Sequence, residues 1–221
     1  MKKLLLILLL FPLVSFAQNN GYDSFLEKKS EKLVPANANA YNDSGDEKFD
    51  LKDYYGAIAD YTKAIELDPD YDAAYYRRGL SKHYLKDYYG AIADYTKSIG
   101  FDPDYASTYS NRGLSKAGLE DYYGAIADYT KAIELNPDYA NAYFYRGLAK
   151  YDLKDHERAI ADYTKAIELY PDFDSAYYNR GSAKNFLEDY YGAIADYTKS
   201  IGFDPDYAGA YSNRGISKEN I

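Results

Sequence analysis

The stretch DYYGAIADYTKAIELDPDY, which begins at Asp53, recurs with small changes four more times along this chain of 221 residues. The later copies begin at Asp87, Asp121, Asp155 and Asp189. One proline recurs at intervals of 34 residues, at Pro69, Pro103, Pro137, Pro171 and Pro205. A fixed period of this length indicates a stack of structural repeats, in which each repeat needs its neighbours to bury its core. The chain is therefore expected to form one elongated unit.

Each repeat has the pattern of two helices, which we call helix A and helix B in chain order. In the second repeat, apolar and small residues recur at steps of three and four in the segment before Asp87 and again in the segment after it, which is helical periodicity. Asp87 can cap helix B, and Pro103 prevents that helix from continuing. No stretch shows a sustained alternation of polar and apolar residues, so we expect no strands.

The period predicts full repeats at residues 38–71, 72–105, 106–139, 140–173 and 174–207, followed by a half repeat at residues 208–221. The sequence also has a longer period of three repeats, because residues 87–106 and residues 189–208 are identical and lie three repeats apart. We expect about eleven helices. The last one should run from Ala208 to about Lys218 and cover the open end of the stack.

The fixed positions of the third repeat are Tyr109, Gly113, Ala125, Tyr129, Ala132 and Pro137. This spacing resembles the tetratricopeptide repeat (TPR) family, and the resemblance covers residues 38–221. It implies an all-α fold, a right-handed superhelical solenoid of antiparallel helix pairs. It also implies a non-catalytic scaffold that binds other proteins, and not an enzyme.

The chain departs from the family pattern where leucine often precedes the glycine of helix A. Arginine stands there instead, at Arg78, Arg112, Arg146, Arg180 and Arg214. Each helix B has an aspartate at a fixed place, at Asp60, Asp94, Asp128, Asp162 and Asp196. We expect each arginine to pair with an aspartate between the two helices, because a buried guanidinium needs a partner that offsets its desolvation. The alternative is an arginine that lies along the surface with only its stem packed.

The first 17 residues have the three parts of a secretory signal peptide, namely Lys2 and Lys3, an apolar run at residues 4–14 and small residues before Gln18. We expect this leader to be cleaved and the protein to be exported, either to the periplasm or to the outer envelope and exterior. After cleavage no membrane span would remain, whereas an uncleaved anchor is the alternative. Residues 18–37 are expected to form a linker or a short capping helix.

The charge of the chain limits the kinds of partner that it can bind, and its cysteine content limits how its core can be stabilised. The formal net charge is −9, and it becomes more negative once Lys2 and Lys3 leave with the leader. A nucleic-acid-binding protein needs a basic surface, so we expect no nucleic acid partner. The chain has no cysteine, so an exported form has no disulfide framework and its core must hold by packing alone.

No metal or cofactor site is expected. His83 and His156 are the only histidines, and they lie in different repeats. The three spaced aspartates that begin at Asp68 resemble the start of a calcium loop, but Ala73 and Gly79 stand where that loop needs glycine and glutamate. No Gly-rich phosphate loop precedes a helix and no Ser/His/Asp arrangement recurs, so we expect no enzymatic activity.

The TPR resemblance implies that helix A lines a concave groove. The matching positions are Tyr76, Leu80, His83, Tyr84, Ser110, Leu114, Phe144, Leu148, Tyr151, Tyr178, Asn185 and Phe186. We expect these side chains to bind a segment of another protein, and the acidic surface favours a basic one. The alternative is that they only pack against neighbouring helices. Two other functions stay open, which are self-association through the incomplete terminal repeat and glycan binding by the groove tyrosines.

Overall fold

The structure of the protein is a computed structural model that describes residues 36–221. The described residues form eleven α-helices and no strand, so the predicted all-α repeat solenoid is confirmed. The first helix begins at Ala36, two residues before the predicted start of the first repeat. The predicted signal peptide, residues 1–17, lies outside the described residues. So does the predicted linker, apart from residues 36 and 37.

The A helices are α3 (Ala36–Asp50), α5 (Asp72–Tyr84), α7 (Ala106–Gly118), α9 (Ala140–Asp152), α11 (Asp174–Phe186) and α13 (Ala208–Glu219). The B helices are α4 (Tyr54–Leu67), α6 (Tyr88–Phe101), α8 (Tyr122–Leu135), α10 (His156–Leu169) and α12 (Tyr190–Phe203). No helix within residues 36–221 combines the length and apolar character that a bilayer crossing needs.

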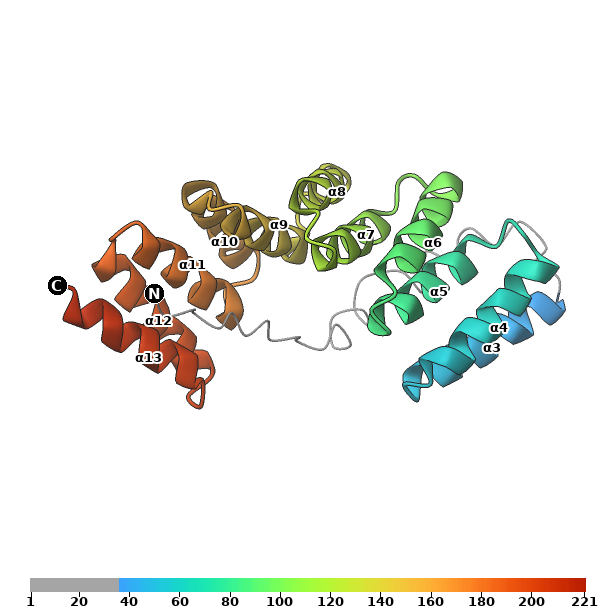
Figure 1. Ribbon diagram of the computed structural model, residues 1–221, viewed down its shortest axis with the longest axis horizontal. Coiled ribbons are helices and arrows are strands. Elements are labelled where there is room, and N and C mark those ends of the chain that lie inside the picture. The colour runs from blue at the N-terminus through green and yellow to red at the C-terminus, as the bar shows by residue number, and fades with distance from the viewer. Residues whose placement is uncertain (1–35) are drawn as a thin grey trace.

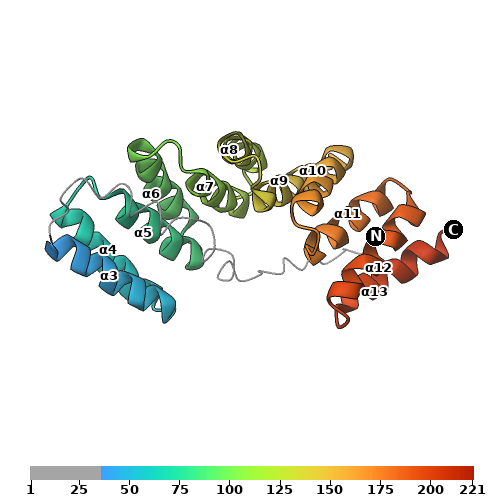
Figure 2. The same ribbon diagram turned by 180° about the vertical axis from the view of Figure 1, so that it is seen from behind.

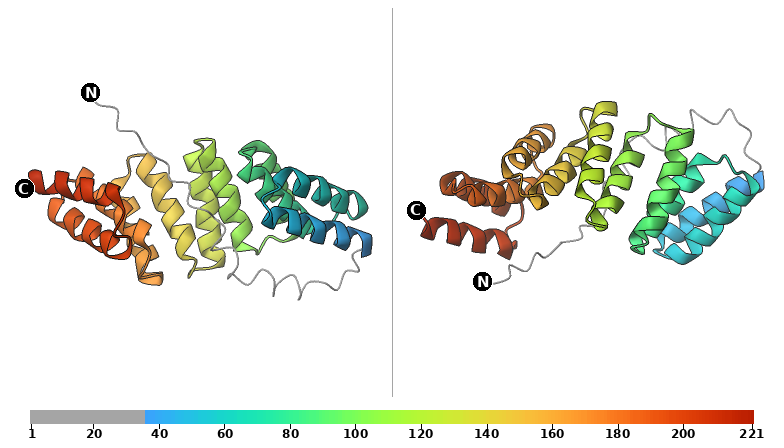
Figure 3. Two further views of the ribbon diagram at one scale, coloured as in Figure 1. Left: turned by 90° about the horizontal axis from the view of Figure 1, so that it is seen from below. Right: turned by 45° about the horizontal axis from the view of Figure 1, so that its top comes forward.

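The helix pairs stack side by side into an arch, with α3 near one end and α13 near the other (Figure 1). Each A helix contacts the A helix of the next repeat, whereas successive B helices of the described chain make no comparable contact. The A helices therefore form the inner layer of the curve and the B helices the outer layer, with α8 at the crest. The opposite view shows the same order (Figure 2), and Figure 3 shows the pairs following one another along the long axis.

The two helices of a repeat approach most closely at a glycine. A Cβ atom on Gly113 of α7 would lie 2.8 Å from Cε1 of Tyr129 in α8, and Tyr129 is only 1% exposed. Any side chain at Gly113 would therefore have to displace a fully buried ring. The same contact recurs in the pairs Gly45–Tyr61, Gly79–Tyr95, Gly147–Tyr163 and Gly181–Tyr197.

In the turn from helix A to helix B, hydrogen bonds satisfy backbone groups both at the end of helix A and at the start of helix B. Glu120 adopts a left-handed conformation with φ of 62° although it is not glycine. The following amide, that of Asp121, donates to the carbonyl of Lys116 at 3.0 Å, which is a common way to end a helix. The Asp121 side chain then accepts the amide of Gly124 at 2.9 Å and caps α8.

The turn from helix B back to helix A uses the aspartates that resemble a calcium loop. The Asp68 side chain accepts the backbone amide of Asp70 at 3.2 Å, which forms an Asx turn. Asn136 does the same for Asp138 at 3.1 Å. Within the described residues no group of three or more histidine or acidic side chains could hold a metal ion.

A charged ladder joins the helices of a repeat to each other and to the repeat before. Asp128 of α8 accepts from Nε and Nη2 of Arg112 at 2.9 and 2.7 Å, and Lys116 reaches the same carboxylate at 2.7 Å. The remaining nitrogen of Arg112, Nη1, donates to Thr96 of the preceding repeat at 3.1 Å. Bidentate, charge-assisted hydrogen bonds of this kind are stronger than neutral ones.

The predicted Arg–Asp pairing is confirmed in four repeats, as Arg78–Asp94, Arg112–Asp128, Arg146–Asp162 and Arg180–Asp196. In the first repeat Ser44 replaces the arginine, and Ser44 and Lys48 both donate to Asp60. In the terminal half repeat Arg214 donates to Thr198 at 3.3 Å and has no carboxylate partner among the described residues.

Candidate functional site on the inner face

Two of the predicted groove residues, Tyr76 and Phe144, are buried, with 7% and 8% of their surfaces exposed. The aromatic residue just before the next A helix covers each of them. The ring centroid of Tyr105 lies 5.9 Å from that of Tyr76, and the centroid of Phe173 lies 4.7 Å from that of Phe144. The Tyr76 hydroxyl also accepts from the Asn111 amide group at 2.9 Å. This corrects the expectation that these two rings line an open groove, because they instead hold neighbouring repeats together.

Ser110 and Tyr178 occupy the same position in the third and fifth repeats. Ser110 is only 1% exposed, so it too offers a partner almost no surface. Tyr178 is half-buried, with its ring centroid 4.7 Å from that of Tyr207, and its hydroxyl accepts from Asn213 at 3.0 Å. The position thus serves mainly as a seam between repeats.

The accessible aromatic surface begins with a group that we call the N-terminal aromatic cluster, made by Phe49, Tyr54 and Tyr84. The rings of Tyr54 and Tyr84 stack at 4.9 Å with an interplanar angle of 5°, and Phe49 lies edge-on to both at 5.4 and 5.5 Å. Tyr84 is half-buried, and burial raises the pKa of its hydroxyl to about 12. Tyr84 was predicted from the sequence, whereas its two neighbours were not.

An equivalent group, the C-terminal aromatic cluster, lies three repeats further along and contains Tyr151, His156 and Phe186. His156 stacks on Phe186 at 4.8 Å with an angle of 11°, and Tyr151 lies edge-on to both at 5.0 and 5.7 Å. Phe186 is 52% exposed, the largest open surface among the predicted groove residues. Burial lowers the pKa of His156, so its ring is an aromatic surface and not a cation at neutral pH.

The two clusters contain three residues that we did not predict, which are Phe49, Tyr54 and His156. Each residue of the N-terminal cluster has its counterpart 102 residues later in the C-terminal cluster. This is the same interval that separates the identical segments 87–106 and 189–208. The longer period was therefore a usable signal, and it would have pointed to Tyr54 and His156 at the start of helix B.

His83 and Asn185 also occupy equivalent positions and serve as links between repeats. Nδ1 of His83 lies 2.8 Å from the hydroxyl of Ser115, and the hydroxyl of Ser217 donates to the side-chain oxygen of Asn185 at 2.8 Å. Burial lowers the pKa of His83 to about 4, so the histidine is neutral at physiological pH. Both side chains therefore make a hydrogen bond to the A helix of the next repeat.

The remaining predicted residues are Leu80, Leu114 and Leu148, which are half-buried and pack against the core rings beneath them. These leucines form an apolar surface between the two clusters. The inner face also carries Asp152, beside Tyr151 at the end of α9, and burial raises the pKa of this carboxyl. The twelve predicted groove positions include no lysine or arginine.

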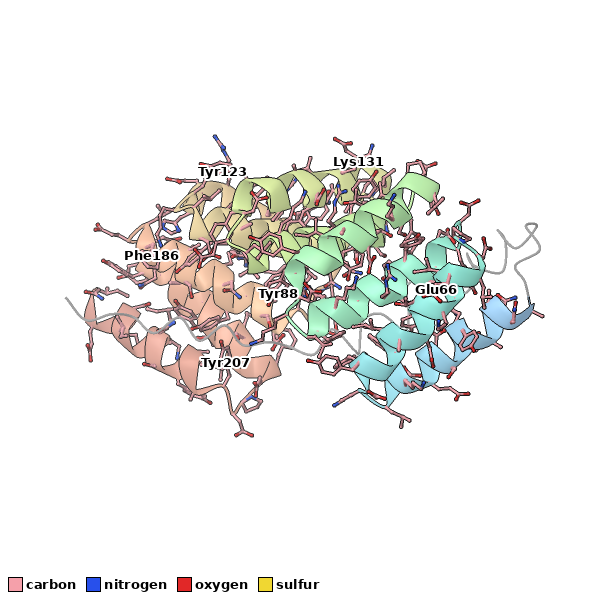
Figure 4. The ribbon with its side chains drawn as sticks, turned by 45° about the vertical axis from the view of Figure 1, so that its right-hand side comes forward. Glu66, Tyr88, Tyr123, Lys131, Phe186 and Tyr207 are labelled. Atoms are coloured by element: carbon pink, nitrogen blue, oxygen red, sulfur yellow. The ribbon has the colours of Figure 1, made fainter. Side chains whose placement is uncertain are left out.

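A second set of tyrosines lies on the outer layer and was not predicted. The second residue of four B helices is a tyrosine that is 73–77% exposed, at Tyr55, Tyr89, Tyr123 and Tyr191. In Figure 4, Tyr123 lies at the outer edge of the arch, well away from Tyr88 and Tyr207. In the fourth repeat Glu157 takes this position, so the row of exposed rings is interrupted.

Family models described as tetratricopeptide repeat match residues 140–173, and also residues 72–105 and 174–207. A model described as TPR repeat matches residues 45–85 and 119–154. The chain belongs to the tetratricopeptide repeat family. Repeats of this family typically build non-catalytic modules for protein interaction, and this TPR chain has the helix pairs and the inner layer of such a module.

Solved structures of TPR proteins resemble this one over most of its length. The crystal structure of MamA protein is 28% identical, covers 78% of this chain and 94% of its own, and has a TM-score of 0.70. YrrB, described as a TPR protein with an unusual peptide-binding site, is 22% identical with coverages of 89% and 98% and a TM-score of 0.69. TTC0263, a thermophilic TPR protein in Thermus thermophilus, is 18% identical with coverages of 82% and 99% and a TM-score of 0.63. No curated protein sequence matches the chain.

Proposed function

We propose that the protein is a non-catalytic scaffold that binds a segment of a partner protein along its inner face. The observation that carries this proposal is the pair of aromatic clusters, which lie at equivalent places where A helices end and B helices begin, and which keep part of their surfaces open. Partly exposed aromatic rings beside a half-buried leucine floor are suited to anchoring an extended or helical segment. Membership of the TPR family supports the same class of function.

The charge of the inner face favours a basic partner. The chain carries a net charge of −9, and the predicted groove positions contribute no cation. Asp152 directly follows Tyr151 of the C-terminal aromatic cluster in the chain and could accept a hydrogen bond or a salt bridge from a lysine or arginine of the bound segment. Association with such a partner should weaken as salt is added, because salt screens exposed charges.

The leader pattern of residues 1–17 supports a second part of the proposal, which is that the protein is exported to the cell envelope or exterior. Fractionation of cells followed by sequencing of the mature N-terminus tests it. A mature chain that begins at Gln18 in an envelope or external fraction is expected. An intact leader on protein recovered from the cytoplasm would contradict export.

Binding to the inner face is best tested with a displayed peptide library, because the partner need not be known. Peptides selected on the wild-type chain would be measured against the Tyr84→Ser/Phe186→Ser double variant and against Tyr123→Ser, which removes an exposed ring from the outer layer. These positions are preferable to Tyr76 and Phe144, whose truncation would cost roughly 3–5 kcal/mol of folding free energy. Far-UV circular dichroism confirms that each variant is folded.

The expected result is a set of basic or aromatic peptides whose affinity falls by at least about thirtyfold in the double variant, as for the loss of hot-spot residues. Their affinity should stay unchanged in Tyr123→Ser. Peptides that respond only to Tyr123→Ser would contradict the inner-face site. If the library gives no peptide and a glycan array gives ligands that the double variant loses, glycan binding replaces the proposed function.

A further inference from the structure

Two of the A helices end in an aromatic residue followed by an aspartate. Helix α3 ends at Phe49 and Asp50, and helix α9 ends at Tyr151 and Asp152. No other A helix within residues 36–221 ends in this way, and the two ends are 102 residues apart, which is the longer period of the sequence. The ring of each pair belongs to one of the two aromatic clusters. Each cluster therefore has an aspartate next to it in the chain.

The two aspartates occupy equivalent places in the fold as well as in the sequence. Burial raises the pKa of the Tyr61 hydroxyl in α4, and the charge of Asp50 adds to that rise. Burial also raises the pKa of the Tyr163 hydroxyl in α10, and there the charge of Asp152 adds to the rise. Tyr61 and Tyr163 are themselves 102 residues apart. Each acid therefore lies near the same core tyrosine of its repeat.

Neither of these carboxylates is paired. Asp50 is exposed and Asp152 is half-buried, and neither side chain makes a hydrogen bond or an ion pair with another residue that the structure describes. Around Asp152, burial raises the pKa of the carboxyl most, Lys154 lowers it and Glu120 raises it. The ladder aspartates differ in this respect, because Asp128, for example, pairs with two cations.

The last residue of a helix is an unfavourable place for an aspartate. Unpaired carbonyl groups give the C-terminus of a helix a partial negative charge, which favours cations there and disfavours carboxylates. The lysines in the last turns of α3 and α9 do not offset this cost, because Lys48 pairs with Asp60 and Lys150 with Asp162. The same unfavourable placement beside both aromatic clusters indicates that the two acids serve a ligand and not the fold.

We propose that Asp50 with the N-terminal aromatic cluster and Asp152 with the C-terminal aromatic cluster form two anchors for lysine or arginine side chains, and that one extended segment of the partner protein occupies both. This inference rests on the proposed function and specifies its partner. At each anchor the carboxylate would pair with the cation, while the rings would contact the apolar stem and attract the charge.

The positions between the two anchors set the form of the segment. Packed helices lie about 8–10 Å apart, so three repeats advance the stack by roughly 30 Å. An extended chain covers about 3.3–3.6 Å per residue, so about nine residues should separate the two cations. Between the anchors the half-buried Leu80, Leu114 and Leu148 offer an apolar surface. Gly118 ends α7 there, so no third carboxylate stands at the end of that helix.

The probes for the test are fluorescein-labelled peptides of about 20 residues, long enough to span both anchors, selected on the wild-type chain from a displayed random library. Each peptide is also made as two halves, and binding is followed by fluorescence anisotropy. The variants are Asp50→Asn, Asp152→Asn and the two together. The matched control is Asp104→Asn/Asp206→Asn, which removes two negative charges that are likewise 102 residues apart, from exposed turns between helix B and helix A.

The selected peptides are expected to carry two basic residues about nine positions apart. Their affinity should fall at least about tenfold in each single variant and at least about a hundredfold in the double variant and for the separate halves, with no change in the control. Thermal melts should show the double variant to be at least as stable as the wild type, because two carboxylates leave helix C-termini. A purely structural role of the two acids would instead lower the Tm.

Three results would overturn the inference. Peptides that lose affinity in Tyr84→Ser/Phe186→Ser but keep it in Asp50→Asn/Asp152→Asn would leave the proposed function standing and remove the acidic anchors. Halves that bind as tightly as the whole peptide, with two bound to each chain, would show two independent ligands in place of one segment. A library that yields no binding peptide would overturn both the proposed function and this inference.

Discussion

The same substitution, glycine to alanine, should have opposite effects at two equivalent positions of the stack. Gly113 and Gly215 both lie inside an A helix, where alanine is favoured over glycine by about 1 kcal/mol. At Gly215 the added Cβ meets nothing within 4 Å, so this gain should remain. At Gly113 the Cβ would lie 2.8 Å from the ring of Tyr129, which is 1% exposed and has nowhere to move.

Overpacking a buried site of this kind costs about 1–3 kcal/mol and can exceed that. Gly113→Ala should therefore lower the free energy of unfolding by up to about 2 kcal/mol after the helix-propensity gain is subtracted. For a chain of this size that is a fall of up to about 8 °C in Tm, whereas Gly215→Ala should raise it by up to about 4 °C. Thermal and urea unfolding of the two variants, followed by circular dichroism, measure both shifts.

The contact with Tyr129 can be isolated by a double-mutant cycle. Tyr129→Leu removes most of the ring, so Gly113→Ala should be much less harmful in that background than in the wild type. Equal shifts for Gly113→Ala and Gly215→Ala, or an unchanged penalty in the Tyr129→Leu background, would refute the idea that the ring dictates glycine at this position.

Three more predictions concern the polar contacts. Asp128→Asn should lower the free energy of unfolding by about 3 kcal/mol, because it leaves two partly buried cations without their carboxylate. Between pH 6.5 and about 4 the wild type should lose stability, by up to about 3 kcal/mol, because the unfolded chain binds a proton at His83 that the folded chain accepts only near pH 4. His83→Asn should remove this loss. Asp121→Ala should cost about 1 kcal/mol through the lost helix cap.

Each of these has its own control. Glu134→Gln removes one negative charge from the same helix as Asp128, but from an exposed pair with Lys131, and should change stability by less than about 1 kcal/mol. If both substitutions have the same effect, the ladder is not a stabilising element. A pH profile that is unchanged in His83→Asn would show that another group carries the acid sensitivity. If the amides in the first turn of α8 exchange as slowly in Asp121→Ala as in the wild type, the capping role is contradicted.

The fold could be predicted from the sequence because the repeat length and the helical periodicity within each repeat indicate the same architecture. The proline interval gave the repeat length, and the steps of three and four gave the helices. The Arg–Asp pairing was predictable too, since a recurrent arginine in a helix seam needs a recurrent acid. Only short-range geometry is involved in these inferences, because the partners lie within one repeat.

The inner face was harder to predict because its exposure depends on how one repeat sits against the next. Tyr76 and Phe144 stand at groove positions, yet Tyr105 and Phe173, each 29 residues further along, turn back over them. Whether such a ring covers its neighbour follows from the rotation between repeats, which no local pattern encodes. The left-handed turn at Glu120 was equally hidden, since a charged residue there gives no glycine signal.

The hydrogen bond from each ladder arginine to a threonine of the preceding repeat influences where the stack begins to unfold. Each arginine ties its repeat to the B helix of the repeat before, so a central repeat is held on two sides and a terminal one on a single side. Stability of this kind behaves as a one-dimensional chain of nearest-neighbour couplings. Opening should therefore begin at the ends, where Arg214 lacks its acid and Ser44 replaces the first arginine, and amide hydrogen exchange should slow progressively towards α7, α8 and α9.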